Sequence, residues 1–442
     1  MTKKLFMCGL LSLSLALPFS AYAEASDTVS DKSDTESISN IAFNSSSSSS
    51  NTKLPLMQRI TPYGFIRNYF CYDSRDSYYG SEGLFYIMPK DENLDKNGKD
   101  LNAFGSMRFL SITTRLGFKV DLDKVWGADA SAVIEADFKG GSSIPYVLRL
   151  RKAYFNLKWE HNNILAGKTW HPMSSCLVPD VLSLNTGAPY NPFSRTAQIT
   201  WTGKYGKFSP IAGLMFQSQF NSPGPDGISS SYARKSCVPE LFASANMHLE
   251  NFTFGAGVDI LTVKPHDVTP LGTKSNDKLT TPTFFGYFNY VTGKFTFKAK
   301  YLYGLNTAHL FGISGYAQTY DTTNDSYSYY GLAQHTSWES VTYKFNKNWR
   351  ASLFFGAMKN SGCPKDNAFI SSPDDIFVRG YKNVDSMYRI TPNILYTNGS
   401  LNLGLEYQAT TVNYGDIYSN CTVKNTHSVL NNGITVLMKY NF

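Results

Sequence analysis

The chain alternates apolar and polar residues, position by position, in stretches of about ten residues. Between 401 and 410, the odd positions hold Leu, Leu, Leu, Tyr and Ala, whereas the even positions hold Asn, Gly, Glu, Gln and Thr. Successive side chains of a β-strand point to opposite faces, so this pattern predicts strands with one apolar and one polar face. Stretches of this length are typical of strands that cross a membrane between lipid and a hydrated lumen.

Sixteen such segments follow residue 54. They begin near Thr61, Ser106, Gly127, Val147, Asn162, Ser194, Lys207, Glu240, Asn251, Pro282, Lys294, Gln334, Asn348, Asp385, Ser400 and Thr426. Seven connections are short, whereas the eight near 74–105, 140–146, 171–193, 220–239, 264–281, 305–333, 361–384 and 414–425 are longer. This alternation predicts an all-β fold, an antiparallel up-and-down transmembrane β-barrel of about 16 strands with both termini in the periplasm. In its second strand we expect Leu110, Ile112 and Leu116 to face outward.

The N-terminal residues indicate export from the cytoplasm. Lys3 and Lys4 precede the largely apolar run 5–17, and Ala21-Tyr22-Ala23 matches a small-x-small cleavage site. These features predict a signal peptide over 1–23, cleaved after Ala23. Residues 24–53 contain six consecutive serines and few large apolar residues, so we expect a disordered, Ser-rich periplasmic tether. The barrel then occupies 54–442.

Composition excludes two other membrane architectures. After the N-terminus no run of 18 apolar residues occurs, which excludes a bundle of membrane-spanning helices. A receptor barrel of about 22 strands with a plug needs more chain than the 389 residues from Leu54 to Phe442. Aromatic residues make up 15% of the chain, which favours extended sheet.

The C-terminal residues form the last predicted strand. Apolar residues stand at every second position from Ile434 to Phe442. An alternating strand that ends in an aromatic residue resembles the sorting signal of Gram-negative outer-membrane barrels. We therefore assign Tyr440 and Phe442 as an assembly signal for the barrel-assembly machinery, and expect outer-membrane lipid and lipopolysaccharide around the barrel.

If the apolar faces point to lipid, eleven basic and five acidic side chains point inward. The candidate pore-lining residues are Arg67, Arg115, Lys119, Lys152, Lys298, Lys300, Arg350, Arg389, Glu135, Asp137 and Glu406. Charges around a water-filled lumen set ion selectivity, so the excess of bases favours small anionic solutes. Alternatively, these charges pair with one another and only hydrate the wall. The alternation of the two strand faces places Arg149 and Arg151 outward unless a β-bulge turns them inward.

Three stretches carry a family resemblance: 134–138 (IEADF), 148–154 (LRLRKAY) and 167–170 (GKTW). They resemble the DcaP-like porins and related outer-membrane porins of Bacteroidota, with a weaker likeness at 63–67. The resemblance implies a homotrimeric outer-membrane barrel for passive diffusion of small hydrophilic, often anionic, solutes. The coiled coil of some members is replaced here by the Ser-rich tether. The alternative is a structural or adhesive surface barrel without significant transport.

The third long loop, 171–193, contains four prolines and several apolar residues. Proline stiffens a loop, and apolar residues favour a packed one. General sixteen-stranded porins fold their third loop into the lumen, so we expect this loop to fold inward and constrict the pore. The alternative is a lid on the outer rim.

The sequence gives only weak indications of catalysis or metal binding. No Gly-x-Ser-x-Gly elbow is present, so we expect neither an enzyme such as a barrel phospholipase nor a cofactor. The mature cysteines lack Cys-x-x-Cys spacing, so we expect no metal site, and their pairing stays open: Cys71, Cys176, Cys237, Cys363 and Cys421. No nucleic-acid partner is expected.

The assembly signal leads to a first prediction. A Phe442→Ser variant should be secreted normally but should assemble poorly, because the last strand must be recognised and paired before the barrel can close in lipid. The amount of heat-modifiable barrel in outer-membrane fractions measures this. Wild-type amounts of folded Phe442→Ser barrel would contradict the assignment.

Overall fold

The computed structural model describes residues 56–80, 83–139, 147–364 and 370–442. The predicted signal peptide, 1–23, and the predicted tether, 24–53, lie outside the described residues. No helix among the described residues is long and apolar enough to cross a membrane.

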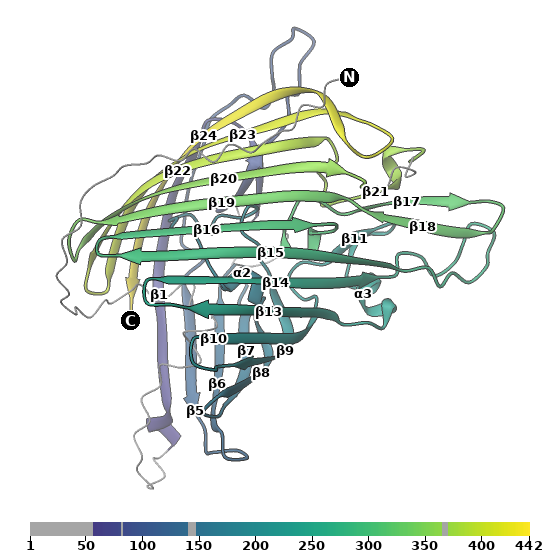
Figure 1. The fold of residues 1–442 in the computed structure, drawn as a ribbon. Helices are drawn as coiled ribbons and strands as arrows, with labels where there is room; N and C mark the ends of the chain where they lie inside the picture. Colours follow the sequence, from purple (N-terminus) through teal and green to yellow (C-terminus); the bar gives the residue numbers. More distant parts are fainter. Residues whose placement is uncertain (1–55, 81–82, 140–146, 365–369) are drawn as a thin grey trace. The chain divides into compact units, whose positions relative to one another are not determined.

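Within the described residues, seventeen antiparallel strand segments form one closed barrel (Figure 1). β4 and β5 both pair with β1 and share one position, so the barrel has sixteen strand positions. The segments are β1 (Ile60–Asp73), β4 (Ser106–Leu110), β5 (Arg115–Asp121), β6 (Asp129–Asp137), β7 (Arg149–Lys158), β8 (Asn162–Trp170), β9 (Arg195–Gly203), β10 (Phe208–Phe216), β13 (Glu240–His248), β14 (Phe252–Val263), β15 (Leu279–Thr292), β16 (Phe295–Gly304), β19 (Ala333–Lys344), β20 (Trp349–Gly362), β22 (Val384–Asn398), β23 (Leu401–Ile417) and β24 (Val423–Asn441).

The first and last strands close the barrel. β1 pairs with β24 from Phe65↔Asn441 to Asp73↔Gly433, and its other edge pairs with β4 and β5. Beyond the ladder, the backbone N–H of Gly64 donates to the carbonyl oxygen of Phe442 at 3.1 Å, and the reverse bond measures 3.0 Å. Within the described residues, the pairing of the first strand with the last thus closes the barrel sheet.

The structure confirms the predicted strands. Each begins within three residues of its expected start. The alternation of faces is also visible: Leu405 is 51% exposed on the outside, whereas its neighbour Glu406 is 1% exposed inside. Short turns gather at one end of the barrel, and the longer connections, with their additional hairpins, gather at the other (Figure 1).

The predicted outward orientation of Leu110 and Ile112 is wrong. Residues 111–114 form a turn between β4 and β5, which shifts the parity of the two segments. Ile112 is only 3% exposed, in a cluster with Tyr69 and with Leu182 from the inward loop, and Leu110 packs against this cluster. Leu116 is exposed, as expected.

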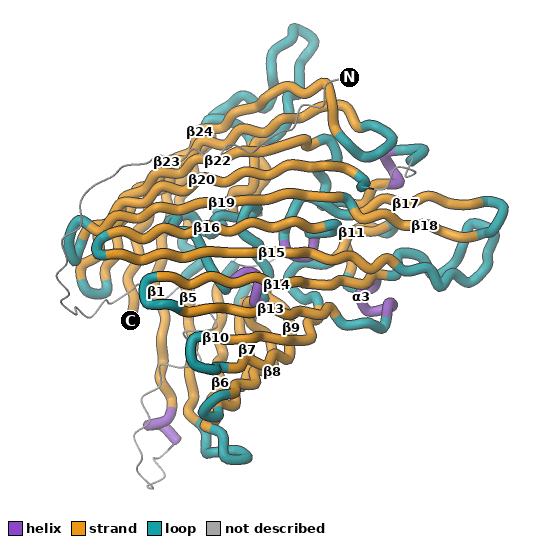
Figure 2. The backbone as a smooth tube through the Cα atoms, in the orientation of Figure 1, coloured by secondary structure: helices purple, strands orange, loops and turns teal. Residues whose placement is uncertain are grey.

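Three connections pack inside the barrel. The first carries the hairpin of β2 (Ser77–Gly80) and β3 (Phe85–Pro89), the second is 171–193 with α2 (Pro172–Ser175), and the third carries η2 (Ala308–Leu310). Their apolar side chains form one core with residues of the wall; its members include Met88, Met173, Tyr190, Trp338 and Phe354. Figure 2 shows α2 and loop segments in the space that the strands enclose. The third long loop thus folds inward, as the sequence predicts.

The remaining short elements lie mainly at the loop end. They are β11 (Ser222–Gly224), β12 (Gly227–Ser229), α3 (Ser231–Ser236), β17 (Tyr316–Asp321), β18 (Ser326–Gly331), η3 (Pro373–Asp375) and β21 (Ile376–Phe377), whereas η1 (Leu56–Arg59) precedes β1. β17 and β18 form a hairpin that extends outward from the barrel (Figure 1).

The seam beside β1 generates a second prediction. A Cβ atom at Gly64 would overlap the carbonyl oxygen of Arg115 and lie 2.8 Å from the Phe442 ring. We expect a Gly64→Ala variant to force β1 away from its neighbours and lose about 1–3 kcal/mol of stability. Its unfolding temperature in heat-modifiability gels should fall. Gly286→Ala is the matched control, because the nearest atom to its added Cβ lies 3.8 Å away; equal temperatures for the two variants would contradict the proposed clash.

Candidate functional site

A β-bulge shapes the charged inner wall. Glu135 of β6 pairs with Lys152 of β7, but the next residue, Ala136, pairs with Leu150, so Arg151 is an extra residue in β7. Arg151 and Lys152 therefore both lie opposite Glu135, which allows both side chains to reach its carboxylate. The bulge turns Arg151 inward, where it is buried, although simple parity places it outside.

Two buried carboxylates hold this wall together. Glu135 accepts a hydrogen bond from Arg151 Nε at 2.9 Å, and its carboxylate lies 3.3 Å from Lys152 Nζ and 3.5 Å from Arg115 Nε. Asp137 binds Arg149 Nη2 at 2.6 Å and Arg151 Nη1 at 2.7 Å. These four bases exceed the two acids, so this part of the wall keeps a positive surplus.

Arg195 adds to the surplus. It is buried at the start of β9, with its guanidinium carbon 4.5 Å from the centre of the Trp170 ring. An aromatic face attracts a cation through its quadrupole. Arg195 therefore extends the basic wall from β5 to β9.

Two buried bases among the predicted pore-lining residues bind backbone carbonyl oxygens of the inward loops. Lys300 Nζ donates to the carbonyl oxygens of Met173 and Leu177 at 2.9 and 2.7 Å. Arg389 donates to the carbonyl oxygen of Ala188 at 2.9 Å and also to that of Ile87, which joins the two inward segments. Both bases are buried, so each anchors loop backbone to the barrel wall.

Acidic contacts hold the middle of the same loop. Asp180 lies 2.9 Å from Lys298 Nζ and 3.2 Å from Arg350 Nη1. Glu406 accepts from the backbone N–H groups of Leu182 and Ser183 at 2.5 and 3.1 Å. These charge-assisted contacts position 180–183 across the barrel interior.

The other predicted residues lie elsewhere. Arg67 is buried, with Nε donating to Thr113 Oγ1 at 3.1 Å. Lys119 is largely exposed near the short-turn end, 3.6 Å from Asp121. Tyr440 and Phe442 are exposed on the outer surface.

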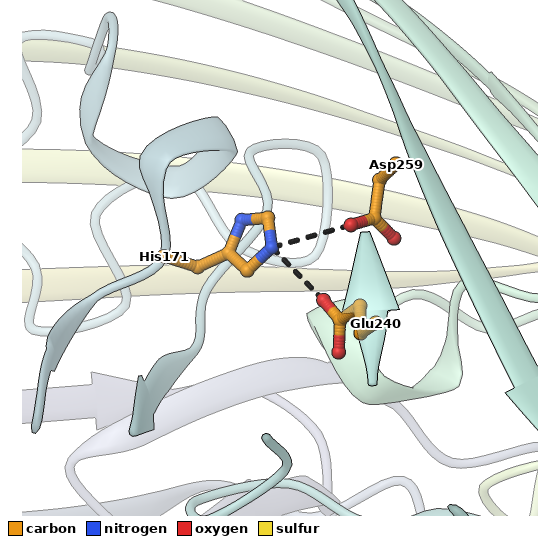
Figure 3. A group of neighbouring side chains, drawn as sticks. All are labelled: His171, Glu240 and Asp259. Atoms are coloured by element: carbon orange, nitrogen blue, oxygen red, sulfur yellow. Dashed lines mark hydrogen bonds and ion pairs between the residues drawn. The ribbon is translucent and has the colours of Figure 1, made fainter. Parts of the chain in front are cut away.

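The structure contains a second charged cluster of four residues, and Figure 3 shows three of them, His171, Glu240 and Asp259. His171 Nε2 lies 2.9 Å from Glu240 Oε1 and 3.5 Å from Asp259 Oδ1. His309 Nε2 lies 3.0 Å from Asp259 Oδ2 and 3.5 Å from Glu240 Oε1. We call these four residues the His–carboxylate tetrad.

The sequence matches none of the known family models, and no curated protein matches it. Solved structures do share the fold. OmpT, an outer membrane protein of Vibrio cholerae, is 10% identical, with a TM-score of 0.52 over 87% of this chain and 97% of that one. An anion-selective porin from Comamonas acidovorans is 10% identical, with a TM-score of 0.51 over 87% and 99%. OmpF of Salmonella typhi is 13% identical, with a TM-score of 0.50 over 87% and 97%.

The chain therefore has a porin-like barrel fold. At these identities the similarity concerns the fold alone, so the function has to be inferred from this chain's own residues.

The Asp180 contacts lead to a third prediction. Burial of Asp180 opposes ionisation, but Lys298 and Arg350 outweigh it and lower its pKa to about 2. A lowered pKa stabilises the fold above the unfolded value of about 3.9, and this contribution is lost as the pH falls towards 2. We expect Asp180→Asn to cost on the order of 1–2 kcal/mol between pH 8 and 5, and less below pH 4.

Unfolding temperatures measured at several pH values test this predicted pH dependence of the stability lost in Asp180→Asn. Asp129→Asn is the control, because Asp129 is exposed near the short-turn end, where its carboxylate lies 3.3 Å from Lys124 Nζ. A difference between wild type and Asp180→Asn that stays constant down to pH 2 would contradict the assigned contacts.

Proposed function

We propose that this protein is an outer-membrane porin for the passive diffusion of small hydrophilic solutes, with a preference for anions. The observation that carries the proposal is a closed barrel whose inner wall holds more bases than acids, as in Arg115, Arg149, Arg151 and Lys152 against Glu135 and Asp137. A positive potential inside a low-dielectric wall concentrates anions.

The inward bases divide into two groups. Lys300 and Arg389 are buried with loop carbonyls as partners, so we assign them to holding the loops. Arg350, Arg149 and Lys298 keep 25%, 28% and 19% of their side-chain surface exposed. We propose these three as the bases that passing solutes encounter beside the inward loop 171–193, which constricts the pore.

We also propose the oligomeric state of the protein and its membrane environment. The resemblance to DcaP-like porins supports a homotrimer in an outer membrane with lipopolysaccharide. Among the structures with a similar fold is a trimeric form of the Vibrio cholerae OmpT. The exposed apolar outer faces of the strands, such as Leu405 and Met438, suit a lipid environment.

The fourth prediction concerns ion selectivity. In planar bilayers with a salt gradient, we expect stepwise conductance and a reversal potential that favours anions. Arg350→Gln should lower the anion-to-cation permeability ratio by about two- to fivefold, since one pore charge contributes on the order of 0.5–1 kcal/mol in hydrated surroundings. The preference should weaken at 1 M salt, where the Debye length is about 3 Å.

Lys347→Gln is the matched control, because it removes one positive charge from the exposed turn next to β20. A cation-selective wild type would refute the anion preference. A folded barrel that gives no conductance would refute the porin and favour a structural or adhesive surface barrel, the alternative function.

A further inference from the structure

The His–carboxylate tetrad joins four separate segments inside the barrel. His171 begins the inward loop 171–193, His309 belongs to η2, Glu240 is the first residue of β13 and Asp259 lies on β14. None of the four side chains is more than 1% exposed. Whatever neutralises the two carboxylates must therefore lie within the tetrad or bind to it.

The backbone determines which nitrogen of His171 carries a proton. Its Nδ1 accepts a hydrogen bond from the backbone N–H of Met173 at 3.1 Å, as the N-cap of α2. Because Nδ1 accepts this hydrogen bond, Nε2 is the ring nitrogen left to act as the donor. It donates to Glu240, and the ring is held edge-on to Phe242 at 5.4 Å between centroids.

Two buried carboxylates, Glu240 and Asp259, share the same two histidines. The ion pairs of Glu240 and Asp259 within the described part of the chain involve only these two histidines. In addition, Glu240 Oε2 and Asp259 Oδ1 are buried oxygens without a hydrogen-bond partner. A buried site with two carboxylates, two imidazole rings and unpartnered acceptor oxygens has the properties of a cation site.

We infer that the tetrad binds one divalent transition-metal ion of the Zn²⁺ or Mn²⁺ type, with Glu240, Asp259 and His309 Nε2 as ligands and His171 as a positioning residue. Bonds of about 2.0–2.2 Å place neighbouring ligand atoms roughly 3–3.5 Å apart. The distances from His309 Nε2 to the two carboxylates, 3.0 and 3.5 Å, fit this spacing. A mixed nitrogen and oxygen ligand set favours such ions over Ca²⁺, which prefers oxygen alone.

The ion would connect the loop that carries η2 to the barrel wall. Its charge would neutralise both carboxylates, and His171 would link the inward loop 171–193 to the same site through Glu240. The inference does not depend on transport through the barrel, so it stands or falls separately from the proposed function.

The experiment measures metal bound to the full-length, detergent-purified protein. The protein is equilibrated with ZnCl₂ or MnCl₂, freed of excess ion by gel filtration, and analysed by elemental mass spectrometry. We expect about one equivalent per chain in the wild type and less than a tenth of this in the double variant Glu240→Gln, Asp259→Asn. Removal of the ion from wild type with a chelator should lower the unfolding temperature.

Glu406→Gln is the matched control, because Glu406 is an equally buried carboxylate that binds loop backbone N–H groups at a different place. This variant should keep the ion, and His171→Asn should bind it more weakly. Folding of every variant is checked by heat-modifiability; should the double variant fail to fold, the wild-type stoichiometry and the Glu406→Gln and His171→Asn results decide. The proposal would be overturned if the wild type bound neither Zn²⁺ nor Mn²⁺. It would also be overturned if Glu406→Gln lost the ion as the double variant does.

Discussion

Backbone hydrogen bonding along the closed seam is the interaction on which the rest of the structure depends. A strand that faces lipid has no water to satisfy its N–H and C=O groups, so every strand needs two partners. β1 meets this demand with β24 on one edge and with β4 and β5 on the other. Where the turn at 111–114 interrupts the ladder, the N–H of Arg67 donates to the Thr114 hydroxyl oxygen at 3.2 Å. A side chain thus replaces a missing backbone acceptor, and the interruption leaves the barrel closed.

The strands were predictable because their signal is local, whereas the departures from regular alternation were not. Two-residue periodicity located each strand start within three residues. A single extra residue such as Arg151 reverses the faces of the strand on one side of it, and the alternation alone cannot decide whether such a residue is present. The turn between Leu110 and Arg115 had the same effect, and it placed Ile112 inside. The His–carboxylate tetrad was even harder to predict from the sequence. Its residues, at positions 171, 240, 259 and 309, share no motif and meet only because the barrel is closed.

The inner charges illustrate a general ambiguity in interpreting a barrel from its sequence. Parity tells which side of the wall a side chain occupies, but it does not tell whether water or a loop meets it there. Lys300 and Lys298 are two residues apart on the same face of β16, and both donate to carbonyl oxygens of the loop 171–193. Lys300 is buried there, whereas Lys298 also pairs with Asp180 and keeps 19% of its side-chain surface exposed. The difference comes from where 171–193 descends, which is a tertiary property.

Two of the three inward connections, the loop 171–193 and the loop that carries η2, also share their supports. The N–H of Phe193, at the end of the inward loop, donates to the carbonyl oxygen of Leu310 at 2.9 Å, while His171, at its start, shares carboxylates with His309. The loop is thus fastened to its neighbour at both ends, and neither can leave its place without breaking polar contacts of the other. Conformational fluctuations of the two segments should consequently be cooperative, occurring as one concerted, all-or-none event.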